Sequence, residues 1–163
     1  MEIYLNNLDW LIFVAKIVLA VICGLVIGIE REFLGKPAGV KTNSIICLGA
    51  CIYTHFSFLA TDGDPTRIAA QVVSGIGFIG AGTILQSKQK IEGLTSASLV
   101  FVNAAIGMLI GGGFFLQGII GTTCLLILYQ FIKNTRFQSK LRTFKINLLC
   151  TSYKDVQTTL DFL

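Results

Sequence analysis

Charged side chains are scarce in this chain. Asp, Glu, Lys and Arg make up 13% of its 163 residues, whereas an ordinary soluble domain carries about 25%. Hydrophobic residues make up 53%, and the mean hydropathy is +0.74. This composition differs from that of a soluble domain and from that of a disordered chain. It predicts a protein that lies in a lipid bilayer, where each crossing helix needs ~20 apolar residues.

Residues that bind metals or act in catalysis are also few. The chain has one histidine and five cysteines, and the cysteines are scattered singly, so they predict no disulfide framework. Cys47, Cys51 and His55 follow one another at intervals of four. A helix would separate Cys47 from His55 by ~12 Å, which is too far for the ligands of one metal ion. No nucleophile and base stand at a useful spacing, so we expect no enzyme, no metal site and no cofactor.

The hydrophobic residues gather in five long runs. Residues 1–9 contain no Lys or Arg, so they lack the basic region of a removable signal peptide, and the run after them is expected to be a span. Glycines at residues 111–113 allow a tight reversal between the last two runs. We predict an all-α membrane protein with a bundle of five transmembrane helices. They cover residues 10–29, 43–60, 67–86, 94–113 and 114–132.

The basic residues predict the orientation of the bundle. Lys and Arg in short loops stay on the cytoplasmic side of a membrane. Of the 13 Lys and Arg residues, all but Lys16 and Arg67 follow the first, third or fifth run. We therefore predict the N-terminus outside and the C-terminus in the cytoplasm. The excess of 13 basic over 9 acidic residues is too small to indicate a nucleic-acid partner.

Glycines mark two predicted packing faces. Ala20, Gly24 and Gly28 share one ridge of the first predicted helix, and such a face lets helices approach closely in lipid. We expect it to form the tightest contact of the bundle with the third helix, through Gly77 and Gly80. The G-x-G-x-x-G spelling at residues 75–80 also fits a dinucleotide loop, but without the strand that such a loop needs. A third helix that is broken there and lines a cavity is a further alternative. The glycines of this run are Gly75, Gly77, Gly80 and Gly82.

Polar residues also occur within the predicted spans. Lys16, His55 and Gln71 lie about 9 Å from the outer ends of their spans by the helical rise, and Asn103 lies near the middle of its span. We hypothesise that these four residues line an outward-facing polar recess. Asp62, Asp64 and Arg67 would form its lip. The alternative is that these side chains only form hydrogen bonds between helices, with Lys16 reaching up to the membrane surface.

Residues 30–43 (EREFLGKPAGVKTN) are the most chemically specific stretch on the predicted cytoplasmic side. Glu30, Arg31 and Glu32 end the first predicted helix, and residues 35–39 shape a turn. Basic residues are explained there as cytoplasmic anchors, but two glutamates are not. An ion-paired network and a carboxylate pair that contacts Mg²⁺ are both open interpretations.

Four motifs resemble, in order and spacing, the hydrophobic domain of the MgtC/SapB family of bacterial inner-membrane proteins. They are GLVIGIERE (24–32), GKPAGVKT (35–42), DPTRIAAQVVSGIGFIGAGTIL (64–85) and GLTSASLVFVNAAIG (93–107). The resemblance implies a five-helix membrane domain that is associated with magnesium limitation and with survival inside host cells, and so with virulence. It also implies that the protein modulates other membrane proteins. Expected partners are an ATP synthase subunit, a small regulatory membrane peptide or a second copy of the chain.

The resemblance also assigns residues. The charged motif of the family falls on Glu30, Arg31, Glu32, Lys36, Lys41, Asp64 and Arg67, and its glycines fall on the run from residue 75 to residue 82. The chain departs from the family at Lys41, where arginine is usual. It also departs at Phe101 and Asn103, where a tryptophan and a small hydroxyl residue are frequent.

The tail resembles the start of a further domain. Longer relatives carry a cytoplasmic domain of ACT-like type, and residues 144–150 with residues 152–163 resemble its first strand and helix. We expect a transmembrane domain in residues 1–135 and an incomplete α/β cytoplasmic tail in residues 136–163.

The predicted function is that of a multi-pass, non-enzymatic regulator in the bacterial inner membrane, which acts at low magnesium by contact with other membrane proteins. No Asp or Glu lies in the core of a predicted span, whereas a Mg²⁺ pathway needs oxygen ligands. The alternative is a component of a transport system for Mg²⁺ or another ion.

Overall fold

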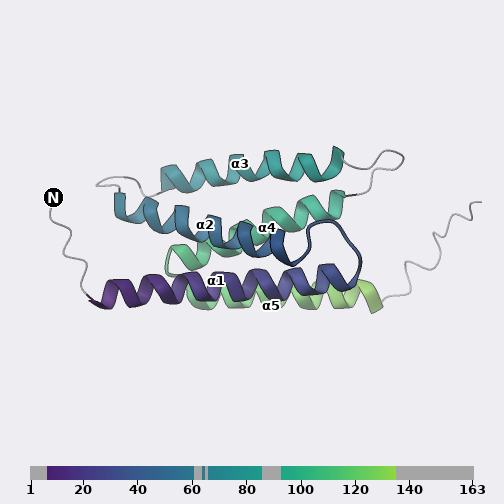
Figure 1. Cartoon of the computed structure of the whole chain (residues 1–163), viewed down its shortest axis with the longest axis horizontal. Coiled ribbons are helices and arrows are strands. Elements are labelled where there is room, and N and C mark those ends of the chain that lie inside the picture. The colour runs from purple at the N-terminus through teal and green to yellow at the C-terminus, as the bar shows by residue number, and fades with distance from the viewer. Residues whose placement is uncertain (1–6, 61–63, 65, 86–92, 135–163) are drawn as a thin grey trace, which may run out of the picture. The chain divides into compact units, whose positions relative to one another are not determined.

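The computed structural model describes residues 7–60, 64, 66–85 and 93–134. These residues form five α-helices and no strand, which confirms the predicted all-α fold. The helices are α1 (Asn7–Phe33), α2 (Val40–Ala60), α3 (Thr66–Leu85), α4 (Leu94–Gly111) and α5 (Phe115–Asn134) (Figure 1). The chain divides into two units, residues 1–129 and 130–163. The strand and helix expected in residues 136–163 lie outside the described residues, so the predicted domain boundary stays a prediction.

The helices have the length and surface of membrane spans. α1 to α4 are each long and apolar enough to cross a bilayer, and α5 carries a shorter apolar stretch, Phe115–Phe131. Large apolar side chains point outwards; Phe78 is 85% exposed and Leu116 is 67% exposed. Such a surface contacts lipid tails in a bilayer. The chain is therefore a multi-pass membrane protein, whereas the crossing of α5 and the orientation stay predictions.

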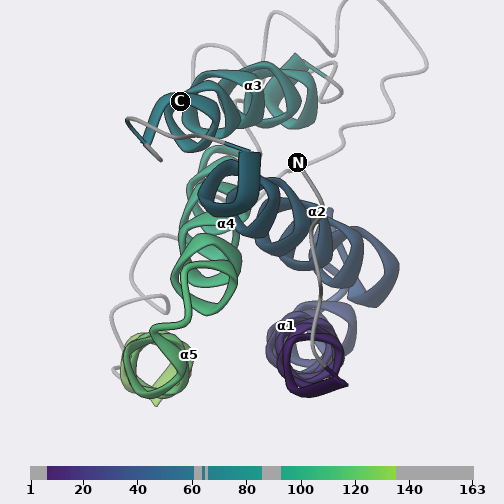
Figure 2. The ribbon, with the colours of Figure 1, turned by 90° about the vertical axis from the view of Figure 1, so that its left-hand side faces the viewer.

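α2 and α4 lie at the centre of the packed helices. α2 contacts α1, α3 and α4, and α4 contacts α1, α2 and α3. Seen along the helices, α3 covers one side of the central pair, and α1 and α5 lie on the other side (Figure 2). The main core cluster consists of Ala20, Cys23, Ile27, Cys47, Cys51, Leu99, Ile106 and Ile110.

Two pairs of glycines bring α1 and α4 into backbone contact with α2. A Cβ atom on Gly24 would lie 2.7 Å from the Cα atom of Ser44, and one on Gly28 would lie 2.5 Å from the Cα atom of Val40. On α4, Cβ atoms on Gly107 and Gly111 would collide with backbone carbonyl oxygens of α2. The glycine face of α1 therefore packs closely, as expected, but its neighbour is α2 rather than α3.

The predicted packing of the third helix is wrong. α3 runs unbroken from Thr66 to Leu85, so it forms neither a dinucleotide loop nor a broken helix. Cβ atoms on Gly75, Gly77 and Gly82 would meet nothing within 4 Å, and one on Gly80 would make an ordinary 3.6 Å contact with Ala97 of α4. Gly80 therefore faces α4, whereas Gly75, Gly77 and Gly82 leave open space beside α3. These three glycines do not share one face, because residues two positions apart in an α-helix, such as Gly75 and Gly77, are separated by about 200° around its axis.

The glycines between α4 and α5 form the predicted reversal. Gly113 has a φ of +90°, a conformation that favours glycine. The backbone N–H of Phe114 donates to the carbonyl oxygen of Leu109 at 2.9 Å, which closes the turn. α5 then begins at Phe115 and returns beside α4, where Gly118 faces the side chain of Ile110.

Candidate functional site: the buried polar ties of the bundle

The charged segment at the end of α1 is built around Arg31, which is 2% exposed. Its guanidinium group donates hydrogen bonds to the hydroxyl groups of Tyr129 and Ser96 and to the carbonyl oxygen of Pro37. It also lies over the ring of Tyr129, 5.5 Å from the ring centre, in a cation–π contact. The Nε atom of Arg31 is buried without a hydrogen-bond partner. Arg31 therefore joins α1, the α1–α2 turn, α4 and α5.

The turn between α1 and α2 is stabilised by two side chains on either side of it, Glu32 and Asn43. Glu32 Oε2 accepts a hydrogen bond of 3.0 Å from the backbone N–H of Val40, which would otherwise lack a partner at the start of α2. Buried Asn43 donates from Nδ2 to the carbonyl oxygens of Ala38 at 2.6 Å and Gly39 at 3.0 Å. These bonds stabilise Ala38 at a φ of 60°, which a residue with a Cβ atom adopts only at an energetic cost.

The other charged residues of this segment lie around Arg31. Glu30 is half-buried and lines a cavity of about 10 Å³ together with Arg31 and Tyr129. Lys36 and Lys41 are exposed. The ion-paired network considered from the sequence does not hold Arg31, because its hydrogen-bond acceptors are neutral oxygens. Among the described residues, no group of three His, Cys, Asp or Glu side chains could hold a metal ion.

A second buried cation lies near the other end of α1. Lys16 is 9% exposed, and its Nζ atom donates to the carbonyl oxygen of Gly111 at 2.9 Å and to Nδ1 of His55 at 3.2 Å. The ring of His55 stacks on Phe13, with 4.7 Å between ring centres. Lys16 thus connects α1 with α2 and with the end of α4. Its Nζ atom points toward the end of α4, near the exposed α4–α5 turn.

The four residues of the predicted recess do not meet. Lys16 and His55 are in contact, but buried Asn103 lies elsewhere and donates from Nδ2 to the backbone oxygen of Asn43 at 2.6 Å. Gln71 is exposed on α3. The recess is therefore reduced to the pair of Lys16 and His55, because the helical rise predicts the depth of a side chain and not the direction in which it points.

Asp64 and Arg67 lie at the beginning of α3. Asp64 Oδ1 accepts hydrogen bonds from the hydroxyl group of Thr66 at 2.6 Å and from its backbone N–H at 2.9 Å, which caps the helix. These two bonds, helped by the charge of Arg67, lower the pKa of Asp64 below its usual value. The charged motif is therefore divided between two places in the fold, since Arg31 lies at the last turn of α1 and Asp64 at the first turn of α3.

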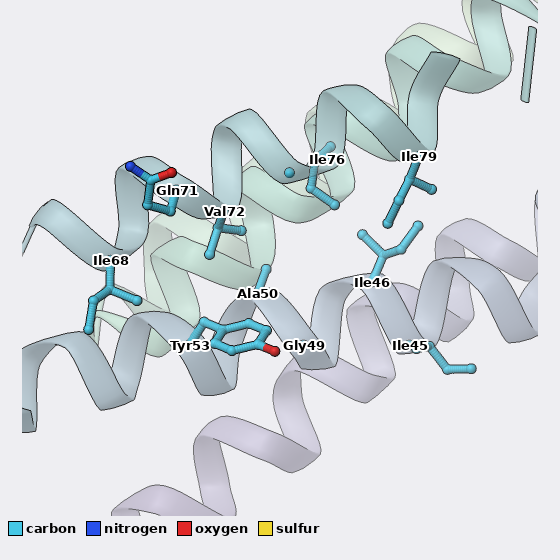
Figure 3. Close-up of a pocket in the computed structure, with 11 residues that line it drawn as sticks. Ile45, Ile46, Gly49, Ala50, Tyr53, Ile68, Gln71, Val72, Ile76 and Ile79 are labelled. Atoms are coloured by element: carbon cyan, nitrogen blue, oxygen red, sulfur yellow. The ribbon is translucent and has the colours of Figure 1, made fainter. Parts of the chain in front are cut away.

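An apolar groove of about 400 Å³ runs between α2 and α3. Figure 3 shows Ile46 and Ala50 of α2 pointing toward α3, and Val72 and Ile76 of α3 pointing toward α2. Gln71 lies at the rim (Figure 3). The remaining lining residues are Ile45, Gly49, Tyr53, Ile68, Gly75 and Ile79.

Several residues of these helix contacts were not predicted from the sequence. Gly107 and Gly111 have the same spacing of four as Gly24 and Gly28, so the packing face of α4 could have been found by the same signal. No such signal marks Ser96 and Tyr129, which lie 65 and 98 residues from Arg31.

Apolar helices joined by buried polar side chains define a multi-pass membrane protein with a tightly packed interior. Within that class, the chain belongs to the MgtC family, whose family model matches residues 17–137. The resemblance found in the sequence motifs is therefore confirmed.

Curated relatives extend this match. The chain is 44% identical over 134 residues to an uncharacterised protein of Haemophilus influenzae, which covers 76% of this chain and 56% of that protein. It is 39% identical over 145 residues to YhiD of Escherichia coli K12, named as a candidate magnesium transporter, with 83% and 67% covered. It is 34% identical over 148 residues to protein MgtC of Brucella abortus, with 85% and 62% covered. The chain thus spans between about half and two thirds of these relatives. No solved structure matches it.

Proposed function

We propose that this protein is a non-enzymatic regulator in the bacterial inner membrane. It acts by binding another membrane protein when magnesium is limiting, as it is for bacteria that survive inside host cells. The membership in the MgtC family and the magnesium-related name of YhiD support the link to magnesium. The observation that carries the binding function is the open face of α3, which is defined by exposed Gly77 and Phe78. The proposed partner is a membrane subunit of the ATP synthase, as the family resemblance suggests.

Three glycines of α3 differ from the glycines that hold α1 and α4 against α2. Gly24 and Gly28 are covered by α2, and so are Gly107 and Gly111, which leaves no room for a Cβ atom. On α3, Gly75, Gly77 and Gly82 have nothing within 4 Å of a Cβ atom, and 17% of the span is buried.

Small residues on a membrane helix let another backbone approach closely. Lipid tails are as apolar as protein side chains, so helices associate through close packing rather than through a hydrophobic force. The open face of α3 leaves room for a helix beyond those that the described residues pack against it. The adjoining groove between α2 and α3 would receive the larger apolar side chains of that helix.

The interior of the bundle favours regulation over transport. The buried polar and charged residues of the described part are two cations, Lys16 and Arg31, and six neutral residues. Mg²⁺ is bound through carboxylates and other oxygen ligands, and buried cations repel it. The six neutral residues are Asn43, Thr54, Ser57, Ser96, Asn103 and Thr122.

A role in magnesium transport is the second candidate. The name of YhiD supports it, and so do Glu30 and Glu32 beside the α1–α2 turn. This role predicts Mg²⁺ flux into liposomes that contain only the purified protein, and it predicts that Glu30→Gln abolishes the flux. That result would contradict the proposed regulatory function.

Photo-crosslinking in intact membranes at low magnesium tests the partner. A photoreactive residue in place of Phe78, which is 85% exposed on α3, should yield an adduct with an ATP synthase membrane subunit. The matched control replaces Ile127, which is 63% exposed on α5, and should yield none. Gly77→Leu fills the open face without touching the bundle, so it should remove the Phe78 adduct and leave the protein level unchanged.

Three results would contradict the proposal. Equal adducts from Phe78 and Ile127 would mean that α3 only contacts neighbours by chance. An adduct with a second copy of the chain would show that the partner is this protein itself, in a homo-oligomer, and not the ATP synthase. Persistence of the adduct in Gly77→Leu would show that the open face of α3 does not form the contact.

A further inference from the structure

α1 is held to its neighbours in two different ways. At Gly24 and Gly28 it meets the backbone of α2 directly, a contact that does not depend on protonation. Nearer its beginning, α1 is held through Lys16, whose Nζ atom donates to Nδ1 of His55 at 3.2 Å and to the carbonyl oxygen of Gly111 at 2.9 Å.

The bond between Lys16 and His55 exists only in one protonation state of the histidine. An ammonium group has donors and no acceptor, so Nδ1 of His55 must be unprotonated to receive the hydrogen bond, and the ring carries its proton on Nε2. A protonated imidazole has two donors and no acceptor. It would also carry the same charge as Lys16 at a distance of 3.2 Å, and like charges so close repel each other.

In the part of the chain that the structure describes, the charged neighbour bonded to His55 is itself a cation. From α1, the group that faces His55 is Lys16, and on α2 the thiol of Cys51 interacts with Lys16. From α4 the facing group is the Gly111 carbonyl, which does not titrate. At the beginning of α3, the carboxylate of Asp64 interacts with Arg67 and Thr66.

Water can reach this cluster from the α4–α5 turn. Lys16 Nζ lies 4.0 Å from the position of a Cβ atom on Gly113, and Gly113 is exposed. His55 itself is half-buried, so a proton from the medium has a short path to its ring.

We propose that Lys16 and His55 form a pH-sensitive latch between α1 and the α2–α4 pair. At neutral pH the latch is closed, and the first half of α1 is packed against α2 and the end of α4. Protonation of His55 in acidic medium breaks the hydrogen bond and adds repulsion. The first half of α1 then moves away, while the Gly24 and Gly28 contact keeps the second half in place.

Hydrogen–deuterium exchange of the full chain in lipid nanodiscs tests the latch. Exchange is measured at about pH 7.5, above the usual histidine range, and at about pH 4.5, below it, and is corrected for the intrinsic effect of pH. Acidification should raise exchange in residues 8–20 by about tenfold, because a hydrogen bond from a charged group is worth roughly that factor. Residues 24–33 serve as the internal reference and should not change.

Two variants separate the latch from a purely structural role. His55→Gln keeps an acceptor for Lys16 but cannot be protonated, so its exchange should not respond to pH. Lys16→Met removes the cation, so exchange in residues 8–20 should be raised equally at both pH values. The proposal would be overturned if acidification did not raise exchange in residues 8–20 of the wild-type protein. It would also be overturned if acidification raised exchange in either variant as much as in the wild type. Should His55→Gln fail to accumulate, Lys16→Met decides alone.

Discussion

Gly107 of α4 lies directly against the carbonyl oxygen of Cys47 of α2, so closely that a Cβ atom on the glycine would collide with that oxygen. The same relation recurs one turn later between Gly111 and Cys51. The two central helices therefore touch along their backbones, and the carbonyl group of Gly111 remains available to accept the hydrogen bond from Lys16.

Filling this contact should destabilise the bundle. Gly107→Leu forces α2 and α4 apart, and overpacking of this kind costs about 1–3 kcal/mol or more. We expect a lower thermal unfolding midpoint in detergent and less protein in the membrane. Gly77→Leu is the matched control, because its side chain meets open space. Equal stability of the two variants would contradict the backbone contact.

Arg31 should not be replaceable by lysine. Lysine keeps the charge but lacks the planar fork that reaches several acceptors at once, and each hydrogen bond from a charged donor contributes about 1.5–3 kcal/mol. Tyr129→Phe loses one such bond and keeps the ring under the guanidinium, so its loss should be smaller. Chemical denaturation of the two variants in detergent measures the order, with exposed Lys36→Gln as the control. A larger effect in Tyr129→Phe than in Arg31→Lys would contradict the proposed role of Arg31.

The cap of α3 should depend on pH below the usual carboxyl range. The pKa of Asp64 is lowered from 3.8 chiefly by the hydroxyl group of Thr66. A lowered folded-state pKa means that the cap stabilises the fold above the ordinary pKa, and that this contribution is lost as the pH falls through the lowered value. NMR titration of the Asp64 carboxyl carbon should show this lowered midpoint, and Thr66→Val should raise it. An unchanged midpoint in Thr66→Val would show that the hydroxyl group is not the cause.

The orientation can be measured without reference to the fold. An impermeant thiol reagent added from outside should label a cysteine placed at Gly63 and should not label one placed at Gln89, since the basic residues predict opposite sides for these loops. The same treatment of the protein without an added cysteine measures the background from its native thiols. The reverse pattern would mean that the basic residues do not determine the orientation.

The spans and their ends follow from local rules. A bilayer demands long apolar stretches, and the predicted runs agree with the five helices to within a few residues. The end of α1 at its charged last turn, residues 30–33, and the reversal after Gly111 were also visible, because clustered charges and consecutive glycines favour the end of an apolar helix. Single glycines do not interrupt α1 or α3. The spacing of Gly24 and Gly28 likewise showed a close-packing face.

Only the tertiary structure decided which faces meet. In lipid, an apolar side chain has a similar free energy against a neighbouring helix and against an acyl chain. Hydrophobic periodicity therefore does not show how each helix is rotated about its axis. The open space at Gly75 and at Gly77, the contact of Gly24 with α2, and the separation of Asn103 from Lys16 all depend on that rotation. The partners of Arg31 depend on it too, since Ser96 and Tyr129 come to the guanidinium from two other helices, which no pattern within a single helix can reveal.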